Sequence, residues 1–287
     1  MTIDGLPSSG SQVTRPVPPM AAPDAGTSAA MIAVRHVSKT YPRPRGGKGG
    51  LLALDDVTFE VRSGEFISLI GASGCGKTTL LRMMSGLLPF EVGQIFLAGQ
   101  AVAGVPPSIG FVFQEPALLP WRTVRANLAF ALQQSPLTKA ETDAAVQGSL
   151  ALTGLQDFAG YYPHMLSGGM QQRAGLARAL VGRPAVLFMD EPLSALDAFT
   201  RRRLQQEIGA IISRQQSTTV LVTHDVDEAI FFSDRVIVMG SAPGTVRDVL
   251  PVPLPRPRRH ADLLGNPVVG ELRDRVLSLV MGVDMSR

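Results

Sequence analysis

Short apolar runs alternate along the chain with longer segments in which apolar residues recur at helical spacing. The short runs predict buried strands, and they lie at residues 66–70, 94–97, 109–113, 185–189, 218–223 and 235–239. The helical patterns predict a helix directly after the first run, ending near Gly86, and further helices at residues 123–132, 139–153, 167–181, 199–215 and 226–232. Because strands and helices alternate over this core, we predict an α/β fold with a mostly parallel sheet.

The segments before and after this core have other patterns. Residues 31–37 and 51–61 predict the two strands of an antiparallel hairpin, joined by a basic, glycine-rich loop. Residues 1–30 are rich in Pro, Ser, Ala and Gly, which predicts a disordered tail. Residues 251–287 are expected to form a C-terminal extension, with an extended start rich in Pro and Arg and a short helix at 267–281.

Composition narrows the class of protein. With 287 residues and 45% hydrophobic content, the chain can bury a packed core. The formal net charge of +3 is small and no basic stripe with aromatic residues accompanies it, so we expect no nucleic-acid partner. The single cysteine, Cys75, excludes an internal disulfide and fits a reducing cytosol. We see no apolar run long enough to span a bilayer and no secretory signal.

A glycine-rich loop lies between the strand at 66–70 and the helix after it. The loop comprises Gly71, Ala72, Ser73, Gly74, Cys75, Gly76, Lys77, Thr78 and Thr79. This order of strand, loop and helix is typical of a phosphate-binding loop, in which backbone N–H groups and the helix dipole favour an anion. Lys77 can reach the β- and γ-phosphates of a nucleotide, and the Thr78 hydroxyl can bind Mg²⁺.

Polar residues follow several of the predicted strands, where an α/β sheet places its ligand. Asp190 can hold Mg²⁺ through water, and Glu191 can serve as the general base toward an attacking water. His224 and Gln114 each end another strand, and we expect His224 to contact the γ-phosphate or that water. A solvated turn for the two acids and a structural role for the histidine are the alternatives.

A second candidate phosphate-binding segment is Leu166-Ser167-Gly168-Gly169-Met170, where a predicted helix begins. Ser167 is a natural N-cap, which is the simpler interpretation. Two glycines in the first turn make a helix less stable. That cost is explained if backbone N–H groups there must approach a phosphate. The element is too far along the chain from Lys77 to complete the same loop.

These motifs together resemble the ATP-binding subunit of an ATP-binding-cassette (ABC) transporter over residues 31 to about 250. In the family's order they are the Walker A loop at 71–79, the Q-loop residue Gln114, the signature at 166–169, the Walker B acids Asp190 and Glu191, the D-loop at 194–197 and the H-loop residue His224. The resemblance implies a P-loop NTPase with a RecA-like sheet, an antiparallel β region and an α-helical subdomain inserted at about 115–182.

The resemblance also assigns roles within a head-to-tail dimer that encloses two ATP molecules. It implies that ATP and Mg²⁺ are bound, with Lys77, Glu191, His224 and Gln114 as catalytic residues and Thr78, Gln114 and Asp190 as metal ligands. It implies that Ser167, Gly168 and Gly169 hold the ATP of a second copy of the chain, and that Asp197 links the two sites. Tyr41 would stack on adenine; a plain strand-end aromatic is the alternative.

The same resemblance implies that dimer closure moves two membrane permease subunits. It also implies a solute-binding protein as an indirect partner. The chain would then lie peripherally on the cytoplasmic face of the bacterial inner membrane. Leu119-Pro120-Trp121 and Met170 are similar to importers of nitrate, sulfonate and taurine. Trp121 is expected to contact a membrane subunit, with packing inside the helical subdomain as the alternative. A soluble ABC ATPase of DNA repair or ribosomes is the rival, although coiled-coil insertions and tandem cassettes are missing.

Overall fold

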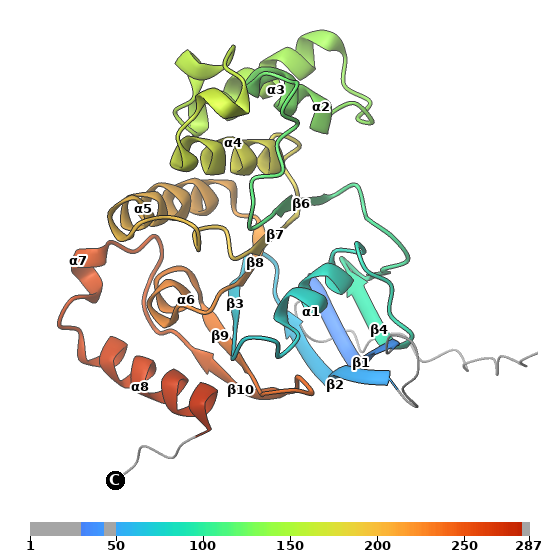
Figure 1. Cartoon of the computed structure of the whole chain (residues 1–287), viewed down its shortest axis with the longest axis vertical. Coiled ribbons are helices and arrows are strands. Elements are labelled where there is room, and N and C mark those ends of the chain that lie inside the picture. The colour runs from blue at the N-terminus through green and yellow to red at the C-terminus, as the bar shows by residue number, and fades with distance from the viewer. Residues whose placement is uncertain (1–29, 43–49, 283–287) are drawn as a thin grey trace, which may run out of the picture.

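The computed structural model describes residues 30–42 and 50–282 (Figure 1). The predicted N-terminal tail lies outside the described residues, except for Ala30. Most of the loop between the hairpin strands also lies outside them. Within the described ranges, helix α1 (Lys77–Met84), which follows the glycine-rich loop, lies between two sheets, and the other helices pack elsewhere on the molecule.

The larger sheet has six strands in the order β10-β9-β3-β8-β7-β6. Its strands are β3 (Phe66–Ile70), β6 (Ile109–Val112), β7 (Val186–Asp190), β8 (Thr218–Val222), β9 (Arg235–Met239) and β10 (Val246–Pro251). All neighbours are parallel except β10 and β9. The predicted parallel core is therefore confirmed. The edge strand β10 was missed because its residues are only half-buried and include Arg247 and Asp248.

The smaller sheet has the order β2-β1-β4-β5 and is antiparallel throughout. It contains β1 (Ile32–Pro42), β2 (Gly50–Val61), β4 (Val92–Leu97) and β5 (Gln100–Ala101). The hairpin is confirmed, and β1 runs beyond the predicted end at Val37 because its ladder continues to the pair Pro42–Gly50. The apolar side of this sheet packs against α1 and one face of the larger sheet.

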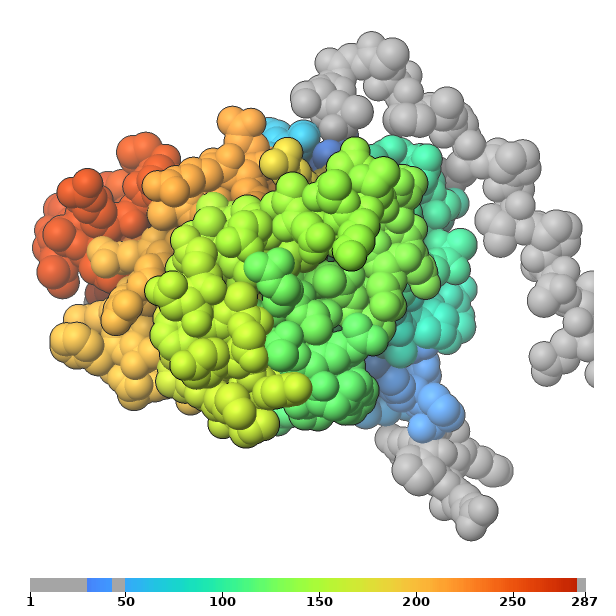
Figure 2. Space-filling model, turned by 90° about the horizontal axis from the view of Figure 1, so that it is seen from above, coloured from blue at the N-terminus to red at the C-terminus, as the bar shows by residue number. Residues whose placement is uncertain are grey.

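The other face of the larger sheet is covered by α5 (Ala198–Gln215) and α6 (Val226–Phe232). Beyond α5 lie α2 (Val124–Ala131), α3 (Lys139–Leu152) and α4 (Gly168–Leu180), which share an apolar core of their own. These three helices form the upper part of Figure 1 and the near face in Figure 2. The helices predicted from periodicity are thus present, within a few residues of the expected bounds.

The C-terminal part packs on the rest of the molecule. Helix α8 (Pro267–Met281) buries Val269 and Val276 against α6 and strands β9 and β10. The short helix α7 (His260–Leu263) was not predicted. Among residues 30–42 and 50–282, no helix has both the length and the apolar character needed to cross a membrane.

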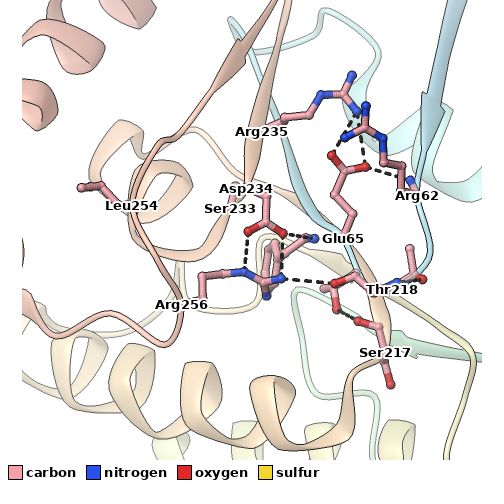
Figure 3. A network of polar contacts seen from close by, with 12 residues as sticks. Arg62, Glu65, Ser217, Thr218, Ser233, Asp234, Arg235, Leu254 and Arg256 are labelled. Atoms are coloured by element: carbon pink, nitrogen blue, oxygen red, sulfur yellow. Dashed lines mark hydrogen bonds and ion pairs between the residues drawn. The ribbon is translucent and has the colours of Figure 1, made fainter.

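Arginines of the segment before α7 join it to the start of the central strands. Arg256 forms two hydrogen bonds with Asp234, at 2.7 and 2.8 Å, and Asp234 also accepts one from the Phe66 N–H at 2.8 Å (Figure 3). Nearby, Arg235 pairs with Glu65 at 3.1 Å. The segment therefore fixes the end of the sheet opposite the phosphate-binding loop.

Candidate nucleotide-binding site

The glycine-rich loop joins β3 to α1 in a conformation that needs glycine. Gly74 and Gly76 have φ angles of 77° and 94°, in the left-handed region that L-residues rarely adopt. A Cβ atom at Gly71 would lie 2.7 Å from the backbone oxygen of Met239. At the start of α1 no side chain caps the first turn. Its N–H groups can therefore face an anion, as the predicted phosphate loop requires.

Lys77 lies inside this loop. Its Nζ atom donates hydrogen bonds to the backbone oxygens of Gly71 at 2.8 Å and Ala72 at 3.0 Å, and the residue is 6% exposed. The loop thus holds the ammonium group at its centre, where it can exchange these carbonyls for phosphate oxygens. Cys75, also in the loop, is buried against the apolar core and packs as a small residue.

Thr78 meets the acidic end of β7 on the other side of the loop. Its Oγ1 donates to Asp190 Oδ1 at 2.8 Å, and Arg82 lies 3.7 Å from the other oxygen of this carboxylate. Burial raises the pKa of Asp190, while the hydrogen bond from Thr78 and the charge of Arg82 oppose the rise. A hydroxyl and a carboxylate oxygen are ligands of the kind that Mg²⁺ takes beside nucleotide phosphates. The pair therefore fits the predicted metal.

Glu191 and His224 come from neighbouring strands and meet at 3.2 Å. Glu191 follows β7, and its N–H donates to the backbone oxygen of Val222 in β8 at 2.9 Å. Its φ of 43° is unusual for a residue with a side chain, and such angles persist where the surroundings impose them. The ring of His224 is more than half exposed. The two predicted residues thus form one pair at the open edge of the sheet.

Gln114 also belongs to this edge. Its Nε2 donates to Ser194 Oγ at 3.3 Å, and Ser194 Oγ donates to the Glu191 backbone oxygen at 3.0 Å. The Q-loop residue is therefore joined to the Walker B and D-loop segments through one hydroxyl. Sequence reasoning did not give Ser194 a contact of its own.

The signature segment lies apart from the phosphate loop in the same chain, at the start of α4 (Figure 1). Ser167 is the N-cap of α4 and accepts from the Met170 N–H at 3.4 Å. A Cβ at Gly169 would lie 3.2 Å from Thr200 of α5, whose own N-cap is Asp197. The signature and D-loop residues are thus adjacent, and nothing within the described chain brings them to Lys77.

Tyr41 lies at the end of β1, beside the phosphate loop. Its hydroxyl group and Thr79 Oγ1 are 3.2 Å apart, and Lys39 Nζ lies 5.6 Å from the ring centroid. The ring is half-buried. The part of the Tyr41 ring that is not buried is available for stacking with the base of a nucleotide.

Two polar residues at this edge were missed by sequence reasoning: Glu228, which is buried, and Arg201, which is partly exposed but has a buried Nε atom. Arg201 of α5 and Glu228 of α6 line a small cavity with Glu191 and His224. Each belongs to a helix that was predicted by periodicity alone. Neither has a motif around it, and only the packing of α5 against α6 shows that they line one cavity.

Comparisons with known proteins identify the family of the chain. A family described as ABC transporter matches residues 54–194. The aliphatic sulfonates import ATP-binding protein SsuB 1 of Xanthomonas axonopodis pv. citri is 50% identical over 207 residues, covering 71% of this chain and 82% of that protein. The chain belongs to the ABC transporter family of ATP-binding proteins.

Other ABC proteins agree with this assignment. The nitrate import ATP-binding protein NrtC of Synechococcus elongatus is 42% identical over 252 residues, which cover 87% of this chain. The chain spans only 38% of that relative's length. The dimeric structure of MJ0796, a bacterial ABC transporter cassette, has a TM-score of 0.67 at 30% identity and covers 77% of this chain and 99% of its own. The predicted family and P-loop fold are therefore confirmed.

Proposed function

We propose that this chain is the ATP-hydrolysing subunit of an ABC importer. The observation that carries the proposal is the convergence of two pairs at one sheet edge: Thr78 with Asp190, and Glu191 with His224. The first pair lies beside a loop built for phosphates, and the second can act on a water molecule. Together they supply binding and proton transfer within a single site.

The roles of the binding residues follow from their positions. Lys77 and the backbone N–H groups from Gly71 to Thr79 hold the β- and γ-phosphates, and Tyr41 stacks on adenine. Thr78, Asp190 and Gln114 are the residues that would hold Mg²⁺, which when bound neutralises charge on the phosphate oxygens. Burial of Asp190 strengthens its interaction with a cation because little water competes there.

Hydrolysis is assigned to the pair formed by Glu191 and His224. The Glu191 carboxylate accepts a proton from water as the water oxygen attacks the γ-phosphorus, and the bond from that phosphorus to the ADP oxygen breaks. His224, held at 3.2 Å from Glu191, orients the carboxylate and contacts the γ-phosphate. Gln114, joined to the same strand end through Ser194, positions the water.

A second copy of the chain completes the site. Ser167, Gly168 and Gly169 begin α4 away from the chain's own phosphate loop, with backbone N–H groups that suit an anion. In a head-to-tail dimer, these residues of one protomer hold the ATP bound to its partner's loop. Asp197, which caps α5 next to the signature glycines, then lies between the two sites.

The transport role rests on the relatives. Two ABC membrane permease subunits would receive the motion of dimer closure, and a solute-binding protein would deliver the solute. Relatives named for nitrate and aliphatic sulfonates import favour a small anionic solute. In that assembly the chain lies peripherally on the cytoplasmic face of the cell membrane. The rival, a soluble ABC ATPase of DNA repair or ribosomes, is not favoured by these relatives.

The test compares wild type with Glu191→Gln, and with Glu271→Gln of α8 as a surface control. Steady-state ATPase activity and size exclusion with and without ATP are measured. We expect hydrolysis in wild type and the control, little in Glu191→Gln, and a dimer of Glu191→Gln that forms only with ATP. Full activity in Glu191→Gln would remove this residue as the base and with it the assigned site.

A further inference from the structure

A small cavity lies beside the Glu191–His224 pair and is not used by the proposed mechanism. Its volume is about 10 Å³, room for roughly one water molecule. Arg201 and Glu228 contribute to its lining. Among the residues that the structure describes, Glu228 Oε1 and Arg201 Nε are buried without a hydrogen-bond partner. Because both residues line the cavity and each has a buried polar atom without a partner, we take the cavity as the candidate site of an ordered water.

Glu228 is an acid almost completely removed from solvent, at 4% exposure. Its Oε2 accepts a short hydrogen bond from the Thr223 hydroxyl, and its own N–H donates to Asp225 Oδ1 at 3.1 Å. The Asp225 N–H in turn donates to Thr223 Oγ1 at 3.1 Å. The two residues that flank His224 are therefore both tied to Glu228.

Arg201 connects the same group to the D-loop. Its NH2 atom donates to the Leu196 backbone oxygen at 2.9 Å, and its NH1 atom lies 3.6 Å from Asp225 Oδ2. Leu196 directly precedes Asp197, the residue expected at the dimer interface. Arg201 therefore links the D-loop to Asp225, the residue after His224.

His224 needs such support because its own ring is more than half exposed. The only polar contact of that ring among the described residues is the one with Glu191. An exposed side chain keeps one orientation when its backbone is fixed, and Thr223 and Asp225 fix it from either side. The geometry of the Glu191–His224 pair thus depends on groups that touch neither nucleotide nor water.

We propose that Glu228 is a positioning residue for ATP hydrolysis: through Thr223, Asp225 and a water molecule shared with Arg201, it holds His224 against Glu191. The inference rests on the proposed ATPase function and adds to it a residue, a bound water and a link to the D-loop. Glu228 acts through its neighbours and does not itself react.

The ionisation of Glu228 gives this role a pH dependence. Burial raises its pKa to about 7, and Asp225 adds to the rise, while the Thr223 hydrogen bond, Arg201 and His224 oppose it. Below that pKa, the neutral carboxyl accepts a hydrogen bond from Thr223 and can donate one from its O–H group toward the cavity. Above it, a negative charge appears beside Asp225, and the arrangement is weakened. Glutamine reproduces the neutral form at every pH.

The first measurement is ATP hydrolysis against pH for wild type, Glu228→Gln and Glu228→Ala, with Glu271→Gln as control. We expect wild-type kcat to fall as pH rises through about 7. Glu228→Gln should keep kcat and lose that fall, whereas Glu228→Ala should lower kcat by about tenfold with little change in KM. An unchanged pH profile in Glu228→Gln together with full kcat in Glu228→Ala would overturn the proposal.

The second measurement is unfolding of the nucleotide-free protein against pH. Because the folded pKa is raised above the ordinary 4.5, the neutral acid favours the folded state at low pH, and this contribution is lost as pH rises toward about 7. The free energy of unfolding of Glu228→Gln should therefore rise relative to that of wild type as pH increases. If the difference between the two proteins is the same at every pH, the folded protein does not raise the pKa of Glu228. If Glu228→Ala does not fold, Thr223→Val takes its place. Inactive wild type would reject the ATPase function instead.

Discussion

Thr78 and Asp190 are 112 positions apart in the sequence, and the hydroxyl of the first donates a 2.8 Å hydrogen bond to the carboxylate of the second. The contact exists because β3 and β7 lie in one parallel sheet, so their carboxyl ends reach the same edge. The fold itself therefore brings the phosphate loop and the acidic strand end together.

The first prediction concerns this pair. Thr78→Ala removes one oxygen ligand, so the Mg²⁺ concentration that gives half-maximal ATPase activity should rise at least about tenfold. Thr78→Ser keeps the hydroxyl and should restore the wild-type value. A Mg²⁺ titration of the three proteins checks this. Identical titrations for Thr78→Ala and wild type would exclude Thr78 as a ligand.

The second prediction separates the ring of Tyr41 from its hydroxyl. Tyr41→Ala removes the stacking surface and should raise KM for ATP by about tenfold, since a base–aromatic stack contributes about 1–3 kcal/mol. Tyr41→Phe keeps the ring and loses only the contact with Thr79, so its KM should stay near wild type. Competition by tripolyphosphate, which has no base, should be equal in all three. If both variants raise KM equally, the hydroxyl and not the ring is responsible.

The fold could be predicted from sequence where the pattern was local. Apolar runs marked each parallel strand, and glycines marked the turn from β3 into α1. The edge strand β10 could not be found this way because an edge strand is half-solvated and its alternation is diluted by charged residues. The length of β1 likewise depends on its partner β2, which continues to pair as far as Gly50.

The candidate site likewise contains residues that could be predicted from local sequence and residues that could not. Residues in short motifs, such as Lys77 and Glu191, could be named because phosphate chemistry dictates the residue types next to one another. Arg201 and Glu228 could not, since a charged residue on an amphipathic helix is normally solvated. Only the tertiary packing of α5 against α6 buries Glu228 and the Nε atom of Arg201, and that packing is set by residues elsewhere in the chain.

The third prediction concerns Arg258, a buried arginine of the C-terminal part. It is 6% exposed and donates to the backbone oxygens of Ile230, Phe231 and Ser233, which end α6. Burial lowers its pKa to about 10, so it remains charged at neutral pH. Arg258→Met leaves those carbonyls without partners and should lower the free energy of unfolding by about 2–4 kcal/mol.

Denaturant unfolding measures this loss, with Arg202→Ala on the exposed side of α5 as control. The control should change the unfolding free energy by no more than about 0.5 kcal/mol. Because α6 begins just after His224, Arg258→Met should also reduce ATPase activity at temperatures where the protein is still folded. Unchanged stability in Arg258→Met would mean that water replaces the guanidinium at the end of α6.

The last prediction concerns Trp121, for which the sequence left two interpretations. The structure rejects packing inside the helical subdomain, because Trp121 is 70% exposed. The loop that carries it is nevertheless rigid: the buried side chain of Asn127 accepts from the Leu119 N–H at 2.7 Å and donates to the Arg122 backbone oxygen at 3.0 Å. A large aromatic residue held outward on a fixed loop is suited to a protein interface.

Trp121→Ala should therefore leave unfolding free energy within about 0.5 kcal/mol of wild type and reduce assembly with the membrane subunits. Co-purification of the two permease subunits from detergent, followed by transport in vesicles, measures the loss. Leu264→Ala, which removes another exposed apolar side chain near α7, is the matched control. Since Trp121 is not among the residues assigned to nucleotide binding or hydrolysis, ATP hydrolysis by the isolated chain should stay unchanged. Normal assembly and transport in Trp121→Ala would place the membrane contact elsewhere on the chain.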